Sequence, residues 1–343
     1  MLLIYGATGY TGGLIAGEAR RRGLKEILLG GRSAEKLRPL AERLGYRFRA
    51  FALAKPDLSG VEAVLHCAGP FSATSRPMVD ACLAARAHYL DITGEVDVFE
   101  AVFARDAEAR ERGVALLPGA GFDVVPSDCL AKHLAERLPG AATLELAFAS
   151  KGRSSPGTLK TMVEGLAQGG CLRRGGKLLR APPASEVREI DFGDRRRSAM
   201  SIPWGDLSTA WRSTGIPDIT VYLAAPASAI RAARLTRYAA PLLGLDAVQS
   251  FLKARIERNV TGPDATERAR GGMRLWGRVT SGQASACATL QTPEGYTFTA
   301  DAALACAGRV LAGGVQPGAW TPAQAFGSAF AATLQGVTMQ DQP

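Results

Sequence analysis

The stretch Gly6-Ala7-Thr8-Gly9-Tyr10-Thr11-Gly12 decides the fold, and it directly follows the apolar run Leu2–Tyr5. The apolar run has the length and composition of a buried strand, and residues 12–22 have the periodicity of a helix. A glycine-rich turn between a strand and a helix is typical of a loop that binds the pyrophosphate of a dinucleotide. We therefore expect the backbone N–H groups of this turn and the positive end of the helix to face phosphate groups.

Each glycine of the turn has a separate predicted task. Gly6 allows a tight turn, Gly9 lets the backbone approach the pyrophosphate, and Gly12 lets the helix pack closely on the strand. The spacing G-x-x-G-x-x-G has one more residue in its first gap than the commonest dinucleotide fingerprint. The other polar residues of the predicted cofactor-binding loop are Thr8, Tyr10 and Thr11.

The residues after the second predicted strand, Glu26–Leu29, indicate which dinucleotide binds. An acidic residue there would hold a free ribose 2′-hydroxyl, but the sequence has Gly30-Gly31-Arg32-Ser33. The Arg32 guanidinium suits a phosphate group, and Ser33 adds a hydroxyl at a helix N-terminus. We therefore predict NADP(H) in preference to NAD(H), the alternative being that Arg32 is a surface arginine in an ordinary turn.

Strand and helix patterns alternate through the first third of the chain. This alternation is typical of an α/β fold of the Rossmann type, a doubly wound parallel sheet with helices on both faces. The further predicted strands are Arg47–Phe51, Ala63–Cys67, Tyr89–Asp91 and Val114–Leu117. The further predicted helices are Ser33–Leu44, Ser75–Arg86 and Glu95–Arg112.

Small residues follow the fourth and fifth predicted strands, at the sheet edge where ligands of open α/β sheets bind. Gly69 would let the ribose and nicotinamide approach the backbone, and Pro70-Phe71 would cover one face of the nicotinamide ring. An ordinary turn is the alternative for both segments. The predicted cofactor-binding residues here are Cys67, Ala68, Gly69, Pro70, Phe71, Thr93 and Gly94.

After Pro126 the pattern indicates a second domain of the α+β class with a mainly antiparallel sheet. Residues Arg274–Thr280 and Ala284–Gln291 alternate between apolar and polar, and Gly282 lies between them. Tyr296–Thr299 is predicted as a third extended segment of this meander. The last predicted helices are Ala302–Leu311 and Thr321–Leu334.

Composition excludes several classes of protein. The chain has 343 residues, of which 47% are hydrophobic and 21% charged, which favours a globular protein of two domains. No apolar run suits a transmembrane helix and no secretory signal is evident, so we expect a cytoplasmic protein. The six cysteines form no C-x-x-C pair and only three histidines occur, so we expect reduced cysteines and no metal site.

The formal net charge is +9, and basic residues gather between residues 173 and 197. Phe192 is the single aromatic residue among these arginines, too few for a single-strand binding surface, so we expect a solvated loop and no nucleic-acid partner. A second stripe, Pro241–Ile256, has apolar residues at helical spacing with basic residues nearby. We expect it to be a packed or dimer-forming helix of a homodimer, with peripheral membrane contact as the alternative.

Longer motifs occur in a fixed order, and they extend the interpretation beyond the first turn. They are Gly6–Gly12, Cys67-Ala-Gly-Pro-Phe71, His88-Tyr-Leu-Asp-Ile-Thr-Gly-Glu95, Pro118-Gly-Ala-Gly-Phe-Asp123, Pro126-Ser-Asp128, Pro203-Trp-Gly-Asp206, Ser213-Thr-Gly-Ile-Pro217 and Gly262-Pro-Asp264 with Arg268. The series resembles the saccharopine dehydrogenase-like oxidoreductases, a family that includes the trans-acting enoyl reductases.

The resemblance implies hydride transfer with NADP(H) or NAD(H). It also implies three parts: a dinucleotide-binding Rossmann domain at residues 1–128, an inserted α+β substrate and dimerisation domain at 129–300, and helices at 301–343 that pack back on the first domain. We expect the substrate pocket between the loops at Gly69–Phe71 and Gly94 and the second domain.

The predicted reaction is hydride delivery to a C=C (enoyl) or C=N bond of a small-molecule, lipid or polyketide substrate, and it needs a proton source. The candidate catalytic residues are Asp123, Asp206 and Tyr10. Asp123 also suits a helix N-cap, and Tyr10 also suits a residue that covers the cofactor. The candidate substrate-binding residues are Trp204 and Phe122. Because no acid–base dyad is obvious, a non-catalytic NADP(H)-binding sensor or scaffold is the alternative function.

Overall fold

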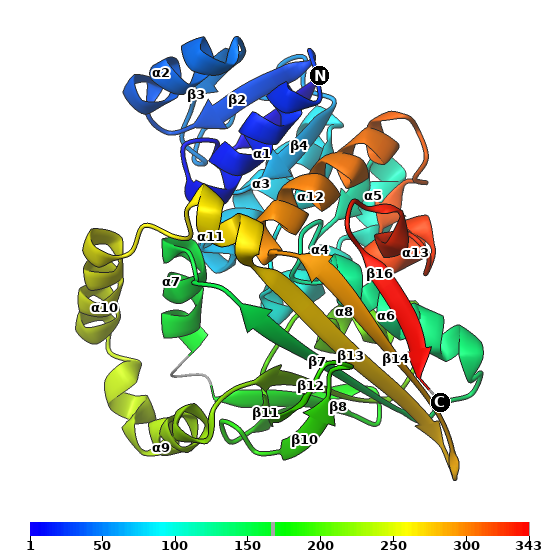
Figure 1. Ribbon diagram of the computed structural model, residues 1–343. Coiled ribbons are helices and arrows are strands. Elements are labelled where there is room, and N and C mark those ends of the chain that lie inside the picture. Colours follow the sequence, from blue (N-terminus) through cyan, green and yellow to red (C-terminus); the bar gives the residue numbers. More distant parts are fainter. Residues whose placement is uncertain (166–168, 343) are drawn as a thin grey trace. The chain divides into compact units, whose positions relative to one another are not determined.

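The computed structural model describes residues 1–165 and 169–342 (Figure 1). The chain forms two compact units. The first contains residues 1–125 and 296–327, and the second contains residues 126–295 and the segment from Ser328 onward. The predicted boundaries at residues 128 and 300 differ from these by a few residues. The segment 301–343, predicted as one part, is divided between the two units.

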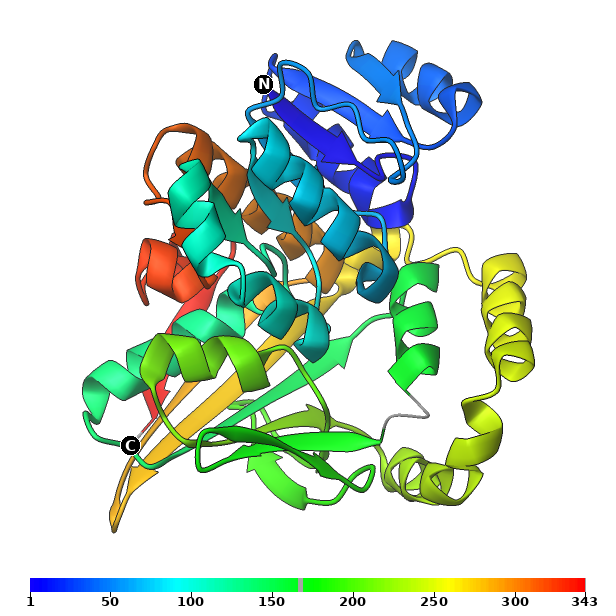
Figure 2. The same cartoon turned by 180° about the vertical axis from the view of Figure 1, so that it is seen from behind.

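The first unit is built on a parallel sheet of seven strands in the order β15-β6-β5-β4-β1-β2-β3. Figure 1 shows α1 and α12 on one face of this sheet, and Figure 2 shows α3 and α5 on the other. This confirms the predicted doubly wound fold of the Rossmann type. The strands are β1 (Leu2–Tyr5), β2 (Ile27–Gly31), β3 (Arg47–Ala50), β4 (Ala63–His66), β5 (His88–Asp91), β6 (Ala115–Leu117) and β15 (Gly318–Ala319). The helices are α1 (Tyr10–Arg21), α2 (Ala34–Leu44), α3 (Phe71–Ala85), α4 (Val96–Phe103), α5 (Asp106–Arg112), α12 (Gly295–Leu311) and α13 (Pro322–Phe326).

The order of strands reverses between β1 and β4, whose last residues Tyr5 and His66 lie side by side. Ligands of open parallel sheets bind beyond the carboxyl ends of the strands at such a reversal. All four residues of β1 are buried, as expected for a strand that is covered on both faces. The loops that follow β1 and β4 therefore lie at the edge where a dinucleotide is expected.

The second unit contains a nine-stranded sheet in the order β10-β11-β12-β7-β13-β14-β16, with β8 paired to β12 and β9 to β8. Among the described pairings only β12 with β7 is parallel, which confirms the predicted mainly antiparallel sheet. The strands are β7 (Thr143–Lys151), β8 (Gly170–Arg174), β9 (Lys177–Ala181), β10 (Val187–Asp191), β11 (Arg196–Ser201), β12 (Asp218–Ala224), β13 (Gly272–Ser281), β14 (Ala284–Pro293) and β16 (Thr338–Gln342). The helices are α6 (Val125–Arg137), α7 (Pro156–Gly165), α8 (Asp206–Thr214), α9 (Ala227–Leu243), α10 (Asp246–Asn259), α11 (Ala265–Arg270) and a 3₁₀ turn at Ala331–Thr333.

The prediction of an extended segment at Tyr296–Thr299 is wrong, because these residues form the first turns of α12. Their aromatic and β-branched side chains favour a strand locally. However, buried positions continue at helical spacing from Phe298 through Ala302 to Cys306. Packing of this apolar face decides the structure in favour of the helix.

Two predicted helices are interrupted. Glu95–Arg112 contains both α4 and α5, and Arg105 at the break donates hydrogen bonds to Asp80 and Glu108 that stabilise the bend. Thr321–Leu334 begins as predicted, since Thr321 caps α13, but α13 ends at Phe326, and the next residue, Gly327, has a φ of +85°. Periodicity alone does not reveal either break, because apolar residues continue on both sides of it.

None of the helices within residues 1–165 and 169–342 is both long and apolar enough to cross a membrane.

Candidate functional site

The glycine-rich turn leaves no room for side chains at its first and third glycines. Gly6 has a φ of +87°, and a Cβ atom there would lie 2.8 Å from the backbone nitrogen of Ala68. A Cβ atom on Gly12 would lie 2.3 Å from the Gly6 carbonyl oxygen. The Gly9 N–H donates to that same oxygen at 2.9 Å. The three glycines therefore form a compact cradle around one carbonyl group.

The N-terminus of α1 opens at this cradle. Its N-cap residue is Gly9, which has no side chain to bond the first N–H groups, and its first turn has no acidic residue. Thr8 and Gly9 are exposed. The positive end of the helix therefore faces outward, an arrangement that fits the pyrophosphate of a dinucleotide.

Tyr10 begins α1 and is half-buried. Its ring contacts Tyr296 of α12 edge to face, with the ring centroids 5.0 Å apart. Thr11 beside it is also half-buried. This packing suits a residue that covers a bound cofactor better than a proton donor.

Arg32 follows β2 directly, at the carboxyl edge of the sheet. Its side chain is exposed, and it forms no ion pair with any residue that the structure describes. Ser33 is the N-cap residue of α2, and its Oγ accepts a hydrogen bond from the Lys36 N–H at 3.3 Å. The Arg32 guanidinium is therefore available for an anion, as the predicted phosphate contact requires.

The loop after β4 packs against the glycine cradle. A Cβ atom on Gly6 would also lie 2.8 Å from the carbonyl carbon of Cys67, so the backbone at Cys67-Ala68 forms one wall of the cradle. The Gly69–Pro70 peptide bond is cis, and α3 begins at Phe71. The structure thus brings these predicted cofactor-binding residues beside the turn at Gly6.

Glu95 has a role that the sequence does not predict. Its Oε1 accepts a hydrogen bond from the Phe71 N–H at 3.0 Å, and its Oε2 accepts one from the Ser72 N–H at 2.8 Å. The carboxylate therefore caps α3 from a distant loop, where the helix dipole favours negative charge. The one available signal was its place at the end of the motif His88–Glu95.

Asp91, at the end of β5, holds the neighbouring loops together. Its Oδ1 accepts hydrogen bonds from the Thr93 N–H at 3.0 Å and the Gly119 N–H at 2.8 Å, and its Oδ2 accepts one from the Tyr89 hydroxyl at 2.7 Å. Burial raises the pKa of Asp91 to about 6, and the three donors oppose this shift. These bonds fix the buried Thr93, and with it the position of Gly94.

Asp123 lies against Gly94, since a Cβ atom on Gly94 would be 3.2 Å from the Asp123 carboxyl group. The Asp123 side chain is only partly exposed. Its burial, together with the negative charge of Glu95, raises the pKa of its carboxyl group to about 7. A carboxyl group with this pKa is protonated in about half of the molecules at neutral pH. Asp123 can therefore exchange protons at the carboxyl edge of the sheet.

Phe122 and His66 are less suited to direct chemistry. The Phe122 N–H donates to Thr299 Oγ1 at 3.0 Å, and its ring packs edge to face on Phe298 with the centroids 6.0 Å apart. Phe122 is therefore part of the core of the first unit.

Burial lowers the pKa of His66 to about 3, so its ring is neutral at physiological pH.

Trp204 and Asp206, the other two predicted site residues, lie in the second unit. The Trp204 ring packs against Phe148 of β7, with the centroids 4.9 Å apart. Asp206 is buried in the first turn of α8, where a carboxylate interacts favourably with the helix dipole.

The basic region between residues 173 and 197 is not the solvated loop that was predicted. Its residues form strands from β8 to β11, and Arg173 is buried and donates to the carbonyl groups of Leu207 and Gly176. Arg174 forms an ion pair with Glu186 at 2.7 Å. Pairing of these arginines within the sheet satisfies charges that the sequence alone presents as unpaired.

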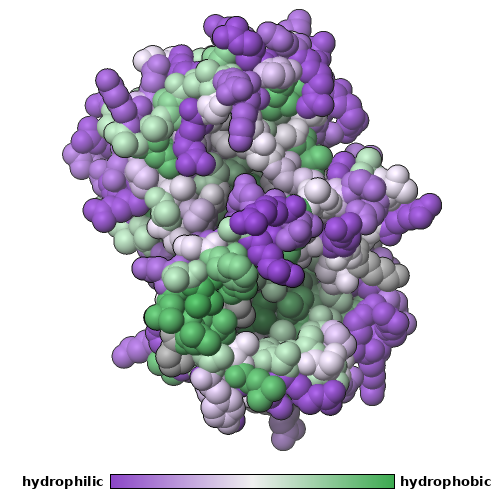
Figure 3. All heavy atoms as spheres, turned by 90° about the vertical axis from the view of Figure 1, so that its left-hand side faces the viewer, coloured by the Kyte–Doolittle hydropathy of each residue, from purple (hydrophilic) through white to green (hydrophobic). Residues whose placement is uncertain are grey.

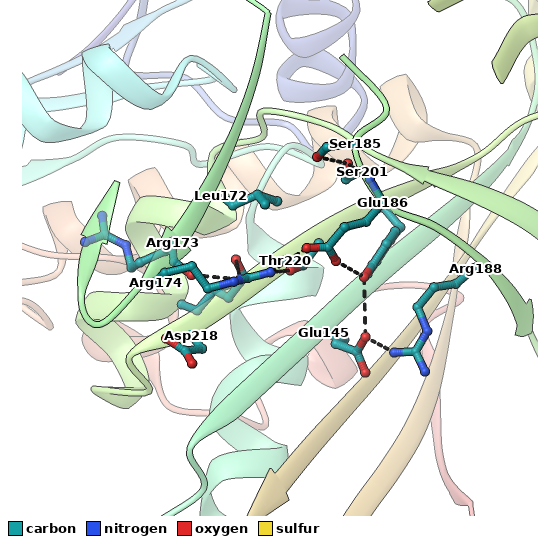
Figure 4. A network of polar contacts seen from close by, with 12 residues as sticks. Glu145, Leu172, Arg173, Arg174, Ser185, Glu186, Arg188, Ser201, Asp218 and Thr220 are labelled. Atoms are coloured by element: carbon teal, nitrogen blue, oxygen red, sulfur yellow. Dashed lines mark hydrogen bonds and ion pairs between the residues drawn. The ribbon is translucent and has the colours of Figure 1, made fainter. Parts of the chain in front are cut away.

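A polar cavity of about 280 Å³ surrounds this network on the second sheet (Figure 4). Glu145 accepts hydrogen bonds from Arg278 at 2.7 and 3.0 Å and also pairs with Arg188. The Tyr222 hydroxyl donates to Glu186 at 2.8 Å. The charged lining residues are Arg174, Arg188, Arg278, Glu145, Glu186 and Asp218. Because acidic and basic groups are equal in number, the cavity has no net charge with which to attract an ion.

Residues 2–117 match the family model described as the saccharopine dehydrogenase NADP binding domain. The match covers the glycine cradle, Arg32 and the loops after β4 and β5. It confirms the prediction that NADP(H) is the cofactor, and the glycine cradle with its open helix end fits that group. Residues 2–117 are thus similar to the dinucleotide-binding domain of saccharopine dehydrogenases.

Curated relatives confirm the predicted resemblance to saccharopine dehydrogenase-like oxidoreductases. A trans-acting enoyl reductase of Mycobacterium ulcerans is 31% identical over 164 residues, which are 43% of this chain and 38% of that protein. The saccharopine dehydrogenase-like oxidoreductase of Mus musculus is 26% identical over 262 residues, which are 62% of this chain and 58% of that protein. The chain therefore spans about half the length of the curated relatives that it matches.

Solved structures support the fold over nearly the whole chain. A saccharopine dehydrogenase (L-Glu forming) from Saccharomyces cerevisiae aligns with a TM-score of 0.66 and 9% identity, covering 100% of this chain and 99% of that one. An amine dehydrogenase from Mycobacterium smegmatis aligns with a TM-score of 0.52 and 12% identity, covering 94% and 95%. At these identities the likeness concerns the architecture alone.

Gly12→Ala should lower the free energy of unfolding by about 1–3 kcal/mol, because the added methyl group overlaps the Gly6 carbonyl oxygen. Gly17→Ala is the matched control in the same helix, since a Cβ atom there meets nothing within 4 Å. It should raise the free energy of unfolding by about 0.5–1 kcal/mol. Urea denaturation measures both, and equal effects of the two substitutions would contradict the close approach.

Arg32→Ala should raise the Kd for NADPH about 10- to 100-fold and leave the Kd for NADH nearly unchanged, because a charge-assisted bond to the 2′-phosphate is lost. Arg43→Ala removes the same charge from an exposed position at the other end of α2 and should change neither value. Fluorescence titration of the bound nicotinamide measures the Kd of the wild type and of both variants for each cofactor. An equal loss for both cofactors would show that Arg32 does not read the phosphate.

Proposed function

We propose that the protein is an NADPH-dependent reductase that acts on a carbon–carbon double bond conjugated to a carbonyl group, with a C=N bond as the second candidate. The glycine cradle and Arg32, which forms no ion pair with a described residue, carry this proposal, because together they supply a pyrophosphate site and a 2′-phosphate site on one sheet edge. The name of the relatives described as trans-acting enoyl reductases supports the C=C bond. Saccharopine dehydrogenase, for which the matching domain is named, supports the C=N bond.

The loops after β1, β2, β4 and β5 have separate tasks in this proposal. The turn at Gly6–Gly12 binds the pyrophosphate, and Arg32 binds the 2′-phosphate. The backbone at Cys67–Phe71 and at Thr93-Gly94 lies along the nicotinamide half of the cofactor, where small residues permit close approach. NADPH supplies the hydride, and orientation of its ring against the acceptor carbon is the task of these loops.

Asp123 is the proposed proton source. Its carboxyl group lies against Gly94, in the loop assigned to the nicotinamide, and its pKa of about 7 keeps a protonated fraction at neutral pH. The Glu95 carboxylate caps α3 and, by its charge, helps to keep Asp123 protonated. In the net reaction the acceptor gains a hydride from NADPH and a proton from Asp123, and solvent returns the proton to Asp123.

The direct test is turnover by the purified protein. NADPH oxidation, followed at the absorbance band of the reduced nicotinamide, should depend on a 2-enoyl thioester such as a crotonyl thioester. A parallel set of imines formed from amino acids and 2-oxo acids tests the C=N alternative. Saturable NADPH binding without turnover across both sets would contradict the proposal and favour an NADP(H)-binding sensor or scaffold.

If Asp123 donates the proton, kcat should fall as the pH rises through about 7, because the protonated form is lost. Asp123→Asn should reduce kcat about 100-fold and remove this pH dependence. Asp123 should also make the free energy of unfolding fall as the pH rises from 4 to 7. The reason is that its pKa is about 7 in the folded state and 3.8 in the unfolded state, so the folded state holds the proton more tightly. Asp123→Asn should abolish that slope too.

Glu95→Gln tests whether the charge of Glu95 raises the pKa of Asp123. Removal of the neighbouring negative charge should lower the pH midpoint of kcat, whereas Glu111→Gln, at an exposed position on α5, should leave it unchanged. A midpoint that does not move with Glu95→Gln would assign the titration to another group.

A further inference from the structure

Two consecutive helices of the second unit, α9 and α10, expose an unusual amount of apolar surface. Figure 3 views the molecule from the side on which α9 and α10 lie in Figure 1, and it shows hydrophobic side chains gathered there. No described residue of α10 is buried. The large apolar side chains, each between 52% and 70% exposed, are Leu235, Tyr238, Leu242, Leu245 and Phe251. The predicted stripe at Pro241–Ile256 is therefore not a packed core helix, and Gly244-Leu245 divides it between two helices.

Contacts on the opposite sides of both helices fix which faces point outward. The Gln249 amide donates to the carbonyl group of Val163 in α7 at 2.9 Å, and Lys253 pairs with Glu164 of α7 at 2.6 Å. On the opposite side of α9, Ile230 is buried and Ala233 and Ala240 are half-buried. The helices are thus attached to the second unit by their inner faces.

The outward faces combine apolar residues with arginine. In α9, Arg231, Leu235, Tyr238 and Leu242 share one face at spacings of four, three and four residues. In α10, Phe251 shares a face with Arg255 and Arg258, and all three are exposed. Arginine between apolar anchors is typical of helices that lie in the interface of a membrane.

The charge of this segment is strongly one-sided. Residues 227–259 contain six basic residues and only two acidic ones, Asp246 and Glu257. Glu257 is already paired with Lys160. Within the described parts of the chain, Arg231, Arg255 and Arg258 form no ion pair. The outward faces therefore present unneutralised positive charge beside apolar side chains.

We propose that the outward faces of α9 and α10, here named the docking face, bind the surface of an anionic lipid bilayer. Leu235, Tyr238, Leu242 and Phe251 enter the headgroup region, and the arginines contact lipid phosphates. A second copy of the chain fits less well, because a two-fold contact would bring two docking faces of the same positive charge together. The proposal is independent of the reductase activity.

Co-sedimentation with vesicles tests the docking face. The wild-type protein should bind vesicles of equal parts phosphatidylcholine and phosphatidylglycerol at least about tenfold more tightly than vesicles of phosphatidylcholine alone, and added salt should weaken the binding. The double variant Leu242→Glu with Phe251→Glu should lose at least about tenfold in affinity for the anionic vesicles. Both positions are exposed, so unchanged NADPH binding should confirm that the variant is folded.

Leu24→Glu is the matched control, since it introduces the same charge at an exposed leucine of the first unit and should leave vesicle binding unchanged. Three results would overturn the proposal. They are failure of the wild type to bind the anionic vesicles, equal binding by the double variant, and a wild-type dimer in analytical ultracentrifugation that the double variant converts to monomer. The last result would assign the docking face to a second copy of the chain.

Discussion

The carbonyl oxygen of Gly6 occupies the space in which a side chain at residue 12 would begin, and the arrangement of the first unit depends on this close approach. It brings the start of α1 directly onto the end of β1, so the first N–H groups of the helix are aimed past the sheet edge. It also leaves the backbone after β4 in contact with the same turn. The turn of the proposed dinucleotide site can therefore form only because residues 6 and 12 have no side chain.

A chain of hydrogen bonds connects the segments that follow β4, β5 and β6. Asp91 accepts the N–H of Gly119 after β6 and the N–H of Thr93 after β5. The Thr93 hydroxyl accepts the N–H of Glu95 at 3.1 Å, and Glu95 in turn caps α3. The carboxylates of Asp91 and Glu95 both accept hydrogen bonds from backbone N–H groups. Substitution of surface side chains does not remove these donors, so the loops around Asp123 stay in place.

The sequence predicts those structural features that are determined by residues close together in the chain. The need for glycine at residues 6 and 12 arises within seven residues, and the alternation of strand and helix is enough to indicate a parallel sheet. The contact of Glu95 with the N-terminus of α3 joins residues 24 apart in sequence, and no local pattern marks it. Similarly, the apolar spacing at Pro241–Ile256 predicts a helix, but it does not predict what contacts the apolar face of that helix. The residues from Tyr296 onward have side chains that favour a strand, but packing of their apolar face makes them helical.

The first unit is assembled from two segments that residues 126–295 separate. During synthesis, β6 emerges long before β15, the strand that pairs with it, and α12 is also still to come. The nascent sheet must therefore persist with an unpaired edge while the ribosome adds residues 126–295. Since β16, the last strand of the second unit, is made after β15, neither unit can be finished before the other is nearly made.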